Sequence, residues 1–271
     1  MSEQSRPEQE QHPVTRSLLA AAREICTRVD IRAIVGYADV FPDSETVAEF
    51  LEDTGDVKLI LATRDEGACD EACAPVGATT LKVPSVRLTR TGQVKVAILL
   101  AMSRGLIGRG DRVLCLSGVA GSEVVDTLFV AEVGEELELF EATGAEEIPS
   151  HVRTEVFERV LGLAVSLGIE GREGRPVGTI FVLGDTEEVL RHSDQLILNP
   201  FRGYPEDERN ILDPGLTETI KEYATLDGAF VVRDDGVVEC AGRFLRSTIP
   251  GRPLPSGLGA RPQSAAAVTA A

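Results

Sequence analysis

The sequence has no tryptophan, few lysines and no long apolar run. It carries 27 basic residues against 44 acidic ones, which leaves a formal net charge of -17 at pH 7. A field of this sign repels nucleic acid and anionic membranes, so we expect neither as a partner. The apolar runs are far shorter than the stretch of about 18 residues that crosses a membrane, and the polar N-terminus is not typical of a signal peptide. We therefore expect a cytoplasmic protein.

The acidic residues are spread along the whole chain instead of being gathered in a tail. Together with the abundance of alanine, valine and glycine, this distribution favours a halophilic protein that stays soluble in high salt. The alternative is an ordinary acidic protein of the cytosol. In either case, a site for an anionic ligand has to be a local basic or metal-containing patch.

Five cysteines form an odd, scattered set. In the reducing cytoplasm we expect them to be free thiols. Cys69 and Cys73 are close in sequence, but no matching pair of His or Cys residues accompanies them. This spacing argues against a zinc site and favours small core residues.

The length of 271 residues allows one large domain or two small ones. Residues 1–13 are polar and contain proline, which predicts a disordered lead. Between residues 14 and 148, helical patterns such as 16–29 and 92–104 alternate with short apolar strands such as 111–117. Strands that alternate with helices predict a small parallel α/β sheet.

A charged stretch that ends in a proline, residues 141–149, indicates the domain boundary. From residue 149 the pattern restarts with an amphipathic helix over 151–168. Strands are predicted over 178–183 and 193–198, and the turn Asp234-Asp235-Gly236 predicts a hairpin. Residues 149–271 therefore form the second predicted domain.

The first domain carries a turn of glycine and serine residues, 117–122, directly after the strand 111–117. Free backbone N–H groups in such a turn attract anions, so one interpretation is a phosphate-binding turn. The other is a structural β-turn, which we prefer because no lysine follows in a P-loop pattern. Residues 110–122 (GDRVLCLSGVAGS) and the strand 127–133 resemble the C-terminal regulatory domain of pyruvate kinase.

Two small-residue motifs of the second domain indicate chemistry. In Asp227-Gly228-Ala229, a carboxylate precedes two residues with almost no side chain, so the backbone can lie flat against a ligand. In residues 257–261 (GLGAR), an arginine follows a second small-residue loop and can reach a phosphate. Together they suggest a nucleoside triphosphate and a metal. Taken alone, Asp227 also fits an Asx-turn before a strand.

Four motifs in order resemble the diadenylate cyclase domain, in the archaeal form that joins it to a pyruvate-kinase-like N-terminal domain. They are residues 178–185 (GTIFVLGD), 199–204 (NPFRGY), 226–230 (LDGAF) and 257–261 (GLGAR). The resemblance implies a mixed-sheet α/β fold for residues 149–271, after the small parallel α/β sheet of residues 14–148.

The resemblance also implies an activity, the condensation of two ATP molecules into the second messenger cyclic di-AMP with release of two pyrophosphates. Asp227 would hold Mn²⁺ or Mg²⁺ and help to activate the attacking hydroxyl, and Arg261 would bind phosphate. Both are the expected catalytic residues. The expected nucleotide-binding residues are Gly228, Ala229, Gly257, Leu258, Gly259, Arg261 and Ser264. Because the family's reaction occurs between two facing subunits, a homodimer or a higher homo-oligomer is implied.

The sequence departs from the family at Pro262, where the arginine motif has a histidine. Proline removes an imidazole and a backbone N–H at this position. The family pattern also continues beyond Ala271, so the domain is expected to be C-terminally incomplete. These departures leave open an alternative function, that of a catalytically impaired, nucleotide-binding regulatory homologue. A further reading places a sensor of small phosphorylated molecules in the N-terminal half.

Overall fold

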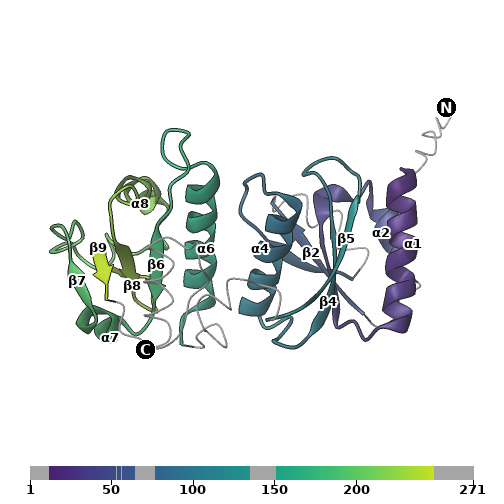
Figure 1. The fold of residues 1–271 in the computed structure, drawn as a ribbon, viewed down its shortest axis with the longest axis horizontal. Coiled ribbons are helices and arrows are strands. Elements are labelled where there is room, and N and C mark those ends of the chain that lie inside the picture. Colours follow the sequence, from purple (N-terminus) through teal and green to yellow (C-terminus); the bar gives the residue numbers. More distant parts are fainter. Residues whose placement is uncertain (1–11, 53, 56, 65–76, 135–150, 247–271) are drawn as a thin grey trace, which may run out of the picture. The chain divides into compact units, whose positions relative to one another are not determined.

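The computed structural model describes residues 12–52, 54–55, 57–64, 77–134 and 151–246. The chain forms two compact units, each with its own sheet (Figure 1). Among the described residues, the first unit comprises those up to 82, 88–98 and 111–131, and the second comprises 83–87, 99–110, 132–134 and 151–246. The two units are described separately.

The first unit is built on a five-stranded sheet with the strand order β3-β2-β1-β4-β5. β1 is parallel to both β2 and β4, and β2 is parallel to β3, which confirms the predicted small parallel α/β sheet. The elements are α1 (Pro13–Arg28), β1 (Ala33–Tyr37), η1 (Ala38–Val40), α2 (Ser44–Glu52), β2 (Lys58–Thr63), β3 (Thr79–Lys82), α4 (Arg90–Ser103), β4 (Arg112–Ser117) and β5 (Thr127–Glu132).

The centre of this sheet is buried on both faces. All five residues of β1 are buried, as are five of the six residues in each of β2 and β4. This pattern is typical of a parallel sheet that helices cover on both sides. The buried Gln93 of α4 joins a helix to the sheet, because its side chain donates to the Gly118 carbonyl at 3.1 Å and accepts from the Ser117 hydroxyl at 2.9 Å.

The turn after β4 already has an anionic partner within the protein. The Gly121 amide donates to the Asp39 carboxylate at 3.1 Å, and the same carboxylate is paired with the Arg64 guanidinium. At Gly118, a β-carbon would lie 2.1 Å from the Val124 carbonyl oxygen, so the tight path of this turn requires glycine. These contacts favour the structural turn over the phosphate-binding turn, because a phosphate would have to displace Asp39 from Gly121.

The second unit is built on a four-stranded sheet with the strand order β6-β8-β9-β7. β6 is parallel to β8, whereas β9 is antiparallel to β8 and to β7, which confirms the expected mixed sheet. The elements are α6 (Thr154–Ile169), β6 (Ile180–Leu183), α7 (Thr186–Arg191), β7 (Ser193–Gln195), η3 (Pro214–Leu216), α8 (Thr217–Tyr223), β8 (Ala229–Val232) and β9 (Val238–Leu245).

Each face of this sheet has its own core cluster. On one face, α6 and α8 pack against Phe230 and Val232 of β8, where the Phe181 and Phe230 rings stack at 5.0 Å between centroids. On the other face, Val189 of α7 packs against Ala229 and Val231. β8 is an inner strand of this sheet and is buried at all four positions.

Several boundaries differ from the sequence prediction. α1 begins at Pro13 instead of Arg16, since proline is well suited to the first turn of a helix. At the start of α2 the Asp43 carboxylate accepts from the Thr46 amide at 2.7 Å. β7 ends at Gln195, so the predicted strand over 193–198 is too long.

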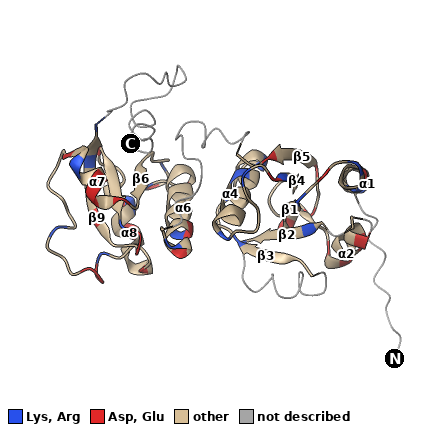
Figure 2. Cartoon of the chain, turned by 90° about the horizontal axis from the view of Figure 1, so that it is seen from below, with Lys and Arg blue, Asp and Glu red and all other residues tan. Residues whose placement is uncertain are grey.

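Charged residues are drawn mainly on the helices and connecting loops, while the strands carry few of them (Figure 2). The described helices include none with the length and apolar character needed to span a membrane.

Candidate functional site

The candidate site is centred on the turn that joins α8 to β8. After α8 the backbone turns through hydrogen bonds between residues three positions apart, including that from the Leu226 N–H to the Tyr223 carbonyl at 3.1 Å. Asp227 follows in this turn, and its side chain is exposed. Two residues later the chain enters the fully buried strand β8. An exposed carboxylate therefore lies two residues before a fully buried strand of the second sheet.

The glycine of the motif is required by packing. Gly228 has φ of +106°, a region that residues with side chains rarely adopt. A β-carbon here would lie 2.6 Å from the Gly242 carbonyl carbon and 2.7 Å from the Arg243 nitrogen. The turn therefore lies directly on the backbone of β9. The predicted role of Gly228 in nucleotide binding stays a prediction, and this contact is a second reason for glycine.

Ala229 is completely buried, with its methyl group in the cluster on the α7 face. Its position in the sheet is opposite Ile180 of β6 and Arg243 of β9. Its assignment to the nucleotide site stays a prediction.

Gly242 lies where three segments of the chain meet. It has φ of +71°, and it sits in the part of β9 where the register with β8 shifts, between the pairs Ala229–Arg243 and Val231–Cys240. The Gly228 backbone packs against one side of it. On another side, a β-carbon at Gly242 would lie 2.5 Å from Cγ1 of Ile197. Sequence reasoning missed this residue, although a glycine within a strand is a signal for a bulge or a close backbone approach.

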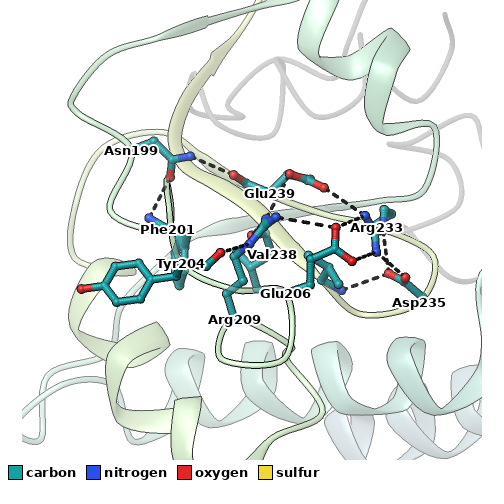
Figure 3. A network of polar contacts seen from close by, with 10 residues as sticks. Asn199, Phe201, Tyr204, Glu206, Arg209, Arg233, Asp235, Val238 and Glu239 are labelled. Carbon is teal, nitrogen blue, oxygen red and sulfur yellow. Dashed lines mark hydrogen bonds and ion pairs between the residues drawn. The ribbon is translucent and has the colours of Figure 1, made fainter.

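A network of arginines and carboxylates fixes the NPFRGY loop to the β8–β9 hairpin (Figure 3). Arg209 donates to the Tyr204 carbonyl, the Val238 carbonyl and, at 3.0 Å, the Glu239 carboxylate. The Asn199 side chain donates to the Glu239 carbonyl at 2.8 Å and accepts from the Phe201 amide at 3.1 Å. The loop that the sequence singled out is thus tied to β9.

Arg233 is the second centre of this network. It pairs with Glu206 at 2.7 Å and with Asp235 at 2.6 Å, and it lies 3.5 Å from Glu239. Hydrogen bonds from Arg233 lower the pKa of both the Asp235 and the Glu206 carboxyl groups below their ordinary values. These groups are partly exposed, so their ion pairs contribute little individually and act mainly to hold the loop.

Burial sets the character of the nearby Cys240 thiol. This residue is 3% exposed on β9, and burial raises the pKa of the thiol to about 11. At neutral pH the group is a protonated thiol, and we assign it no reactive role.

The remaining predicted site residues lie outside the described residues. These residues are Gly257, Leu258, Gly259, Arg261 and Ser264, together with Pro262.

The residues at this site fit a divalent cation that arrives with a nucleotide. Within the described parts of the chain, no group of three or more His, Cys, Asp or Glu side chains is arranged to hold a metal by itself. Mg²⁺ is commonly bound through one or two carboxylates together with substrate phosphates, and this mode needs no preformed protein cage. The exposed carboxylate of Asp227 suits that arrangement.

Two family models match the chain. Residues 15–140 match the model described as "Probable sensor domain DacZ_P". Residues 166–271 match the model described as "DisA bacterial checkpoint controller nucleotide-binding", and this segment contains all four motifs of the second domain.

Two similar proteins, both called diadenylate cyclase, come from Methanocaldococcus jannaschii and Haloferax volcanii. The chain is 35% identical to the first over 178 residues and 33% identical to the second over 179 residues, in each case 65% of this chain. The aligned segments make up 56% and 64% of these relatives, so the chain spans less than two thirds of their length.

Among solved structures, a pyruvate kinase from Cryptosporidium parvum is similar over 45% of this chain and 23% of its own, with 15% identity and a TM-score of 0.36. A likeness at this TM-score does not establish a shared fold. The expected resemblance of the N-terminal part to pyruvate kinase therefore stays a prediction.

Proposed function

Because residues 166–271 match the DisA nucleotide-binding model and residues 15–140 match the DacZ_P sensor model, we propose that the chain is a diadenylate cyclase. The domain matches and the two relatives confirm the resemblance to the archaeal two-domain cyclases that the motifs predicted. The observation that carries the proposal for this chain is the position of Asp227. It is an exposed carboxylate on a turn packed against the backbone of β9, inside the matched segment.

The proposed reaction joins two ATP molecules. The 3′-hydroxyl of each nucleotide attacks the α-phosphate of the other, so two phosphodiester bonds form and two bonds to the leaving pyrophosphates break. Each hydroxyl loses its proton, which Asp227 helps to transfer to water. The protein mainly has to position the two nucleotides and stabilise charge, as in phosphoryl transfer generally.

We assign the roles as follows. Asp227 holds the cation and orients the attacking hydroxyl. Bound Mn²⁺ or Mg²⁺ would neutralise charge on the triphosphate. Gly228 and Ala229 present backbone to the nucleotide, and Arg261 binds phosphate through its planar guanidinium. Gly257, Leu258, Gly259 and Ser264 complete the proposed nucleotide contacts.

The decisive test is product formation by the purified chain. We expect cyclic di-AMP from ATP and MnCl₂, detected by liquid chromatography with mass spectrometry. Asp227→Ala should lower the rate by about 10²- to 10⁴-fold, the range for loss of a group that assists proton transfer. Asp207→Ala is the matched control, since Asp207 is an exposed aspartate in a loop of the same unit.

Two results would contradict the proposal. One is the absence of product from folded wild-type chain that binds ATP, which would instead support the impaired regulatory homologue suggested by Pro262. The other is an equal loss of rate in Asp227→Ala and Asp207→Ala. The comparisons themselves give no support to the impaired alternative.

We also propose the wider setting of this activity. Residues 14–148 form the sensor domain and residues 149–271 the cyclase domain, in a cytoplasmic and halophilic protein whose cyclase domains meet face to face as a dimer. Light scattering with and without ATP tests the dimer. Thermal unfolding in increasing KCl tests the halophilic character, which predicts a rising melting temperature.

A further inference from the structure

The Asp227 turn and the Ile197 side chain both lie against Gly242. The Gly228 backbone contacts Gly242 from one direction, and the Ile197 side chain occupies the space where a Gly242 side chain would be, with Cγ1 and Cδ1 2.5 and 2.9 Å from that point. The Asp227 carbonyl oxygen lies 3.7 Å from the same point. Ile197 therefore packs beside the backbone of the catalytic turn.

The segment that carries Ile197 is held by hydrogen bonds on both sides. Before it, the side-chain amide of Gln195 donates to the Ala241 carbonyl at 2.6 Å, and the backbone N–H of Leu196 donates to the Gly242 carbonyl at 2.9 Å. After it, Asn199 donates to the Glu239 carbonyl at 2.8 Å. These contacts fix the segment along β9 although β7 has ended at Gln195.

Neighbouring apolar side chains are not held in this way. Ile197 is 38% exposed, whereas Leu198 next to it is 96% exposed. A single apolar residue of this segment is thus turned toward Gly242, and its neighbour supplies a matched comparison.

We propose that Ile197 is a positioning residue, which fixes the Asp227 turn through its contact with Gly242. This inference rests on the proposed function, since it gives Asp227 the role of holding the cation. Loss of the Ile197 side chain removes its packing against Gly242 beside the Asp227 carbonyl, so the turn is no longer held at this contact and can shift. A misplacement of about 1 Å at a reacting centre can lower a rate by about a hundred-fold.

The test compares Ile197→Ala with Leu198→Ala in the full chain. Electron paramagnetic resonance of Mn²⁺ measures binding of Mn²⁺ with ATP, and product analysis measures the reaction rate. Ile197→Ala should weaken Mn²⁺–ATP binding and lower kcat by about ten-fold, within the loss that such a displacement can cause. Leu198→Ala should change neither by more than about two-fold, since surface substitutions away from special features usually have small effects. Ile197→Val keeps Cγ1 and should lie between wild type and Ile197→Ala.

A double-mutant cycle separates positioning from a general structural role. If Ile197 acts through Asp227, then adding Ile197→Ala to Asp227→Ala should not weaken Mn²⁺–ATP binding further. Independent losses in the double variant would overturn the proposal, and so would equal losses in Ile197→Ala and Leu198→Ala. If Ile197→Ala does not fold, Ile197→Val carries the test, and an unchanged binding curve in that variant overturns the proposal.

Failure of the inference differs from failure of the proposed function. Wild-type chain without product contradicts the cyclase assignment. Wild-type chain that makes product while Ile197→Ala matches it in rate and in Mn²⁺–ATP binding contradicts only the positioning role.

Discussion

The structure allows the loss of folding free energy to be estimated for the substitution Gly228→Ala. The residue has φ of +106°, and placing a side chain in the left-handed region costs about 1–2 kcal/mol. The new methyl group would lie 2.6–2.8 Å from the backbone of Gly242 and Arg243, which has no flexible end to move aside. Overpacking of this kind costs about 1–3 kcal/mol. We expect a total loss of about 2–5 kcal/mol.

Gly203→Ala supplies the matched control. Gly203 has φ of +91°, but a β-carbon there would meet nothing within 4 Å. Both variants carry the strain of a positive φ and the same change in the unfolded chain. Their difference therefore isolates the collision with β9, which we expect to be about 1–3 kcal/mol.

Hydrogen exchange of peptides from β8 and β9 is the suitable assay, because a chain of two units need not unfold in one step. Each 1.4 kcal/mol corresponds to about a ten-fold change in the opening equilibrium. We expect these peptides to exchange faster in Gly228→Ala than in Gly203→Ala. Equal exchange in the two variants would refute the argument that β9 packing requires the glycine of the motif.

Two further predictions concern the electrostatics of the chain. The lowered pKa values of Asp235 and Glu206 mean that their pairs with Arg233 stabilise the fold above the ordinary carboxyl pKa, and that this contribution disappears as the pH falls through the lowered values. On acidification below about pH 4, the free energy of unfolding should therefore fall less in Arg233→Gln than in the wild-type chain. Identical acid-unfolding profiles of the two chains, followed by circular dichroism, would contradict this. Burial and the raised pKa of Cys240 predict that iodoacetamide at pH 8 labels the partly exposed Cys26 before Cys240. Equal labelling of the two cysteines, measured by mass spectrometry, would contradict the burial of Cys240.

The local pattern of the sequence predicted many elements because short-range rules decide them. The helix predicted over 151–168 is found as α6 (Thr154–Ile169), and Asp234-Asp235-Gly236 forms the expected turn, with the Gly236 amide donating to the Arg233 carbonyl at 3.0 Å. Helical spacing and turn residues act within a few positions of one another, so helices and turns can be predicted without knowing which strands will pair.

Elements that depend on distant partners were predicted less well. The apolar run Leu196-Ile197-Leu198 was predicted as part of a strand, but β7 ends before it. The strand after the predicted hairpin turn, β9, continues as far as Leu245, because Ser193 of β7 pairs with Leu245. The length of a strand depends on the strand beside it, and one sequence does not show which segments will pair.

The same distinction applies to the candidate site. The order of its motifs, with a carboxylate before two small residues, was sufficient to predict the cyclase resemblance that the comparisons confirm. The sequence could not show that Gly228 rests on Gly242, or that Ile197 packs against the same glycine from a segment about 30 residues earlier than the motif. Chemical identity is carried by residue types, which the sequence states directly. Position is decided by contacts between segments that only the folded chain brings together.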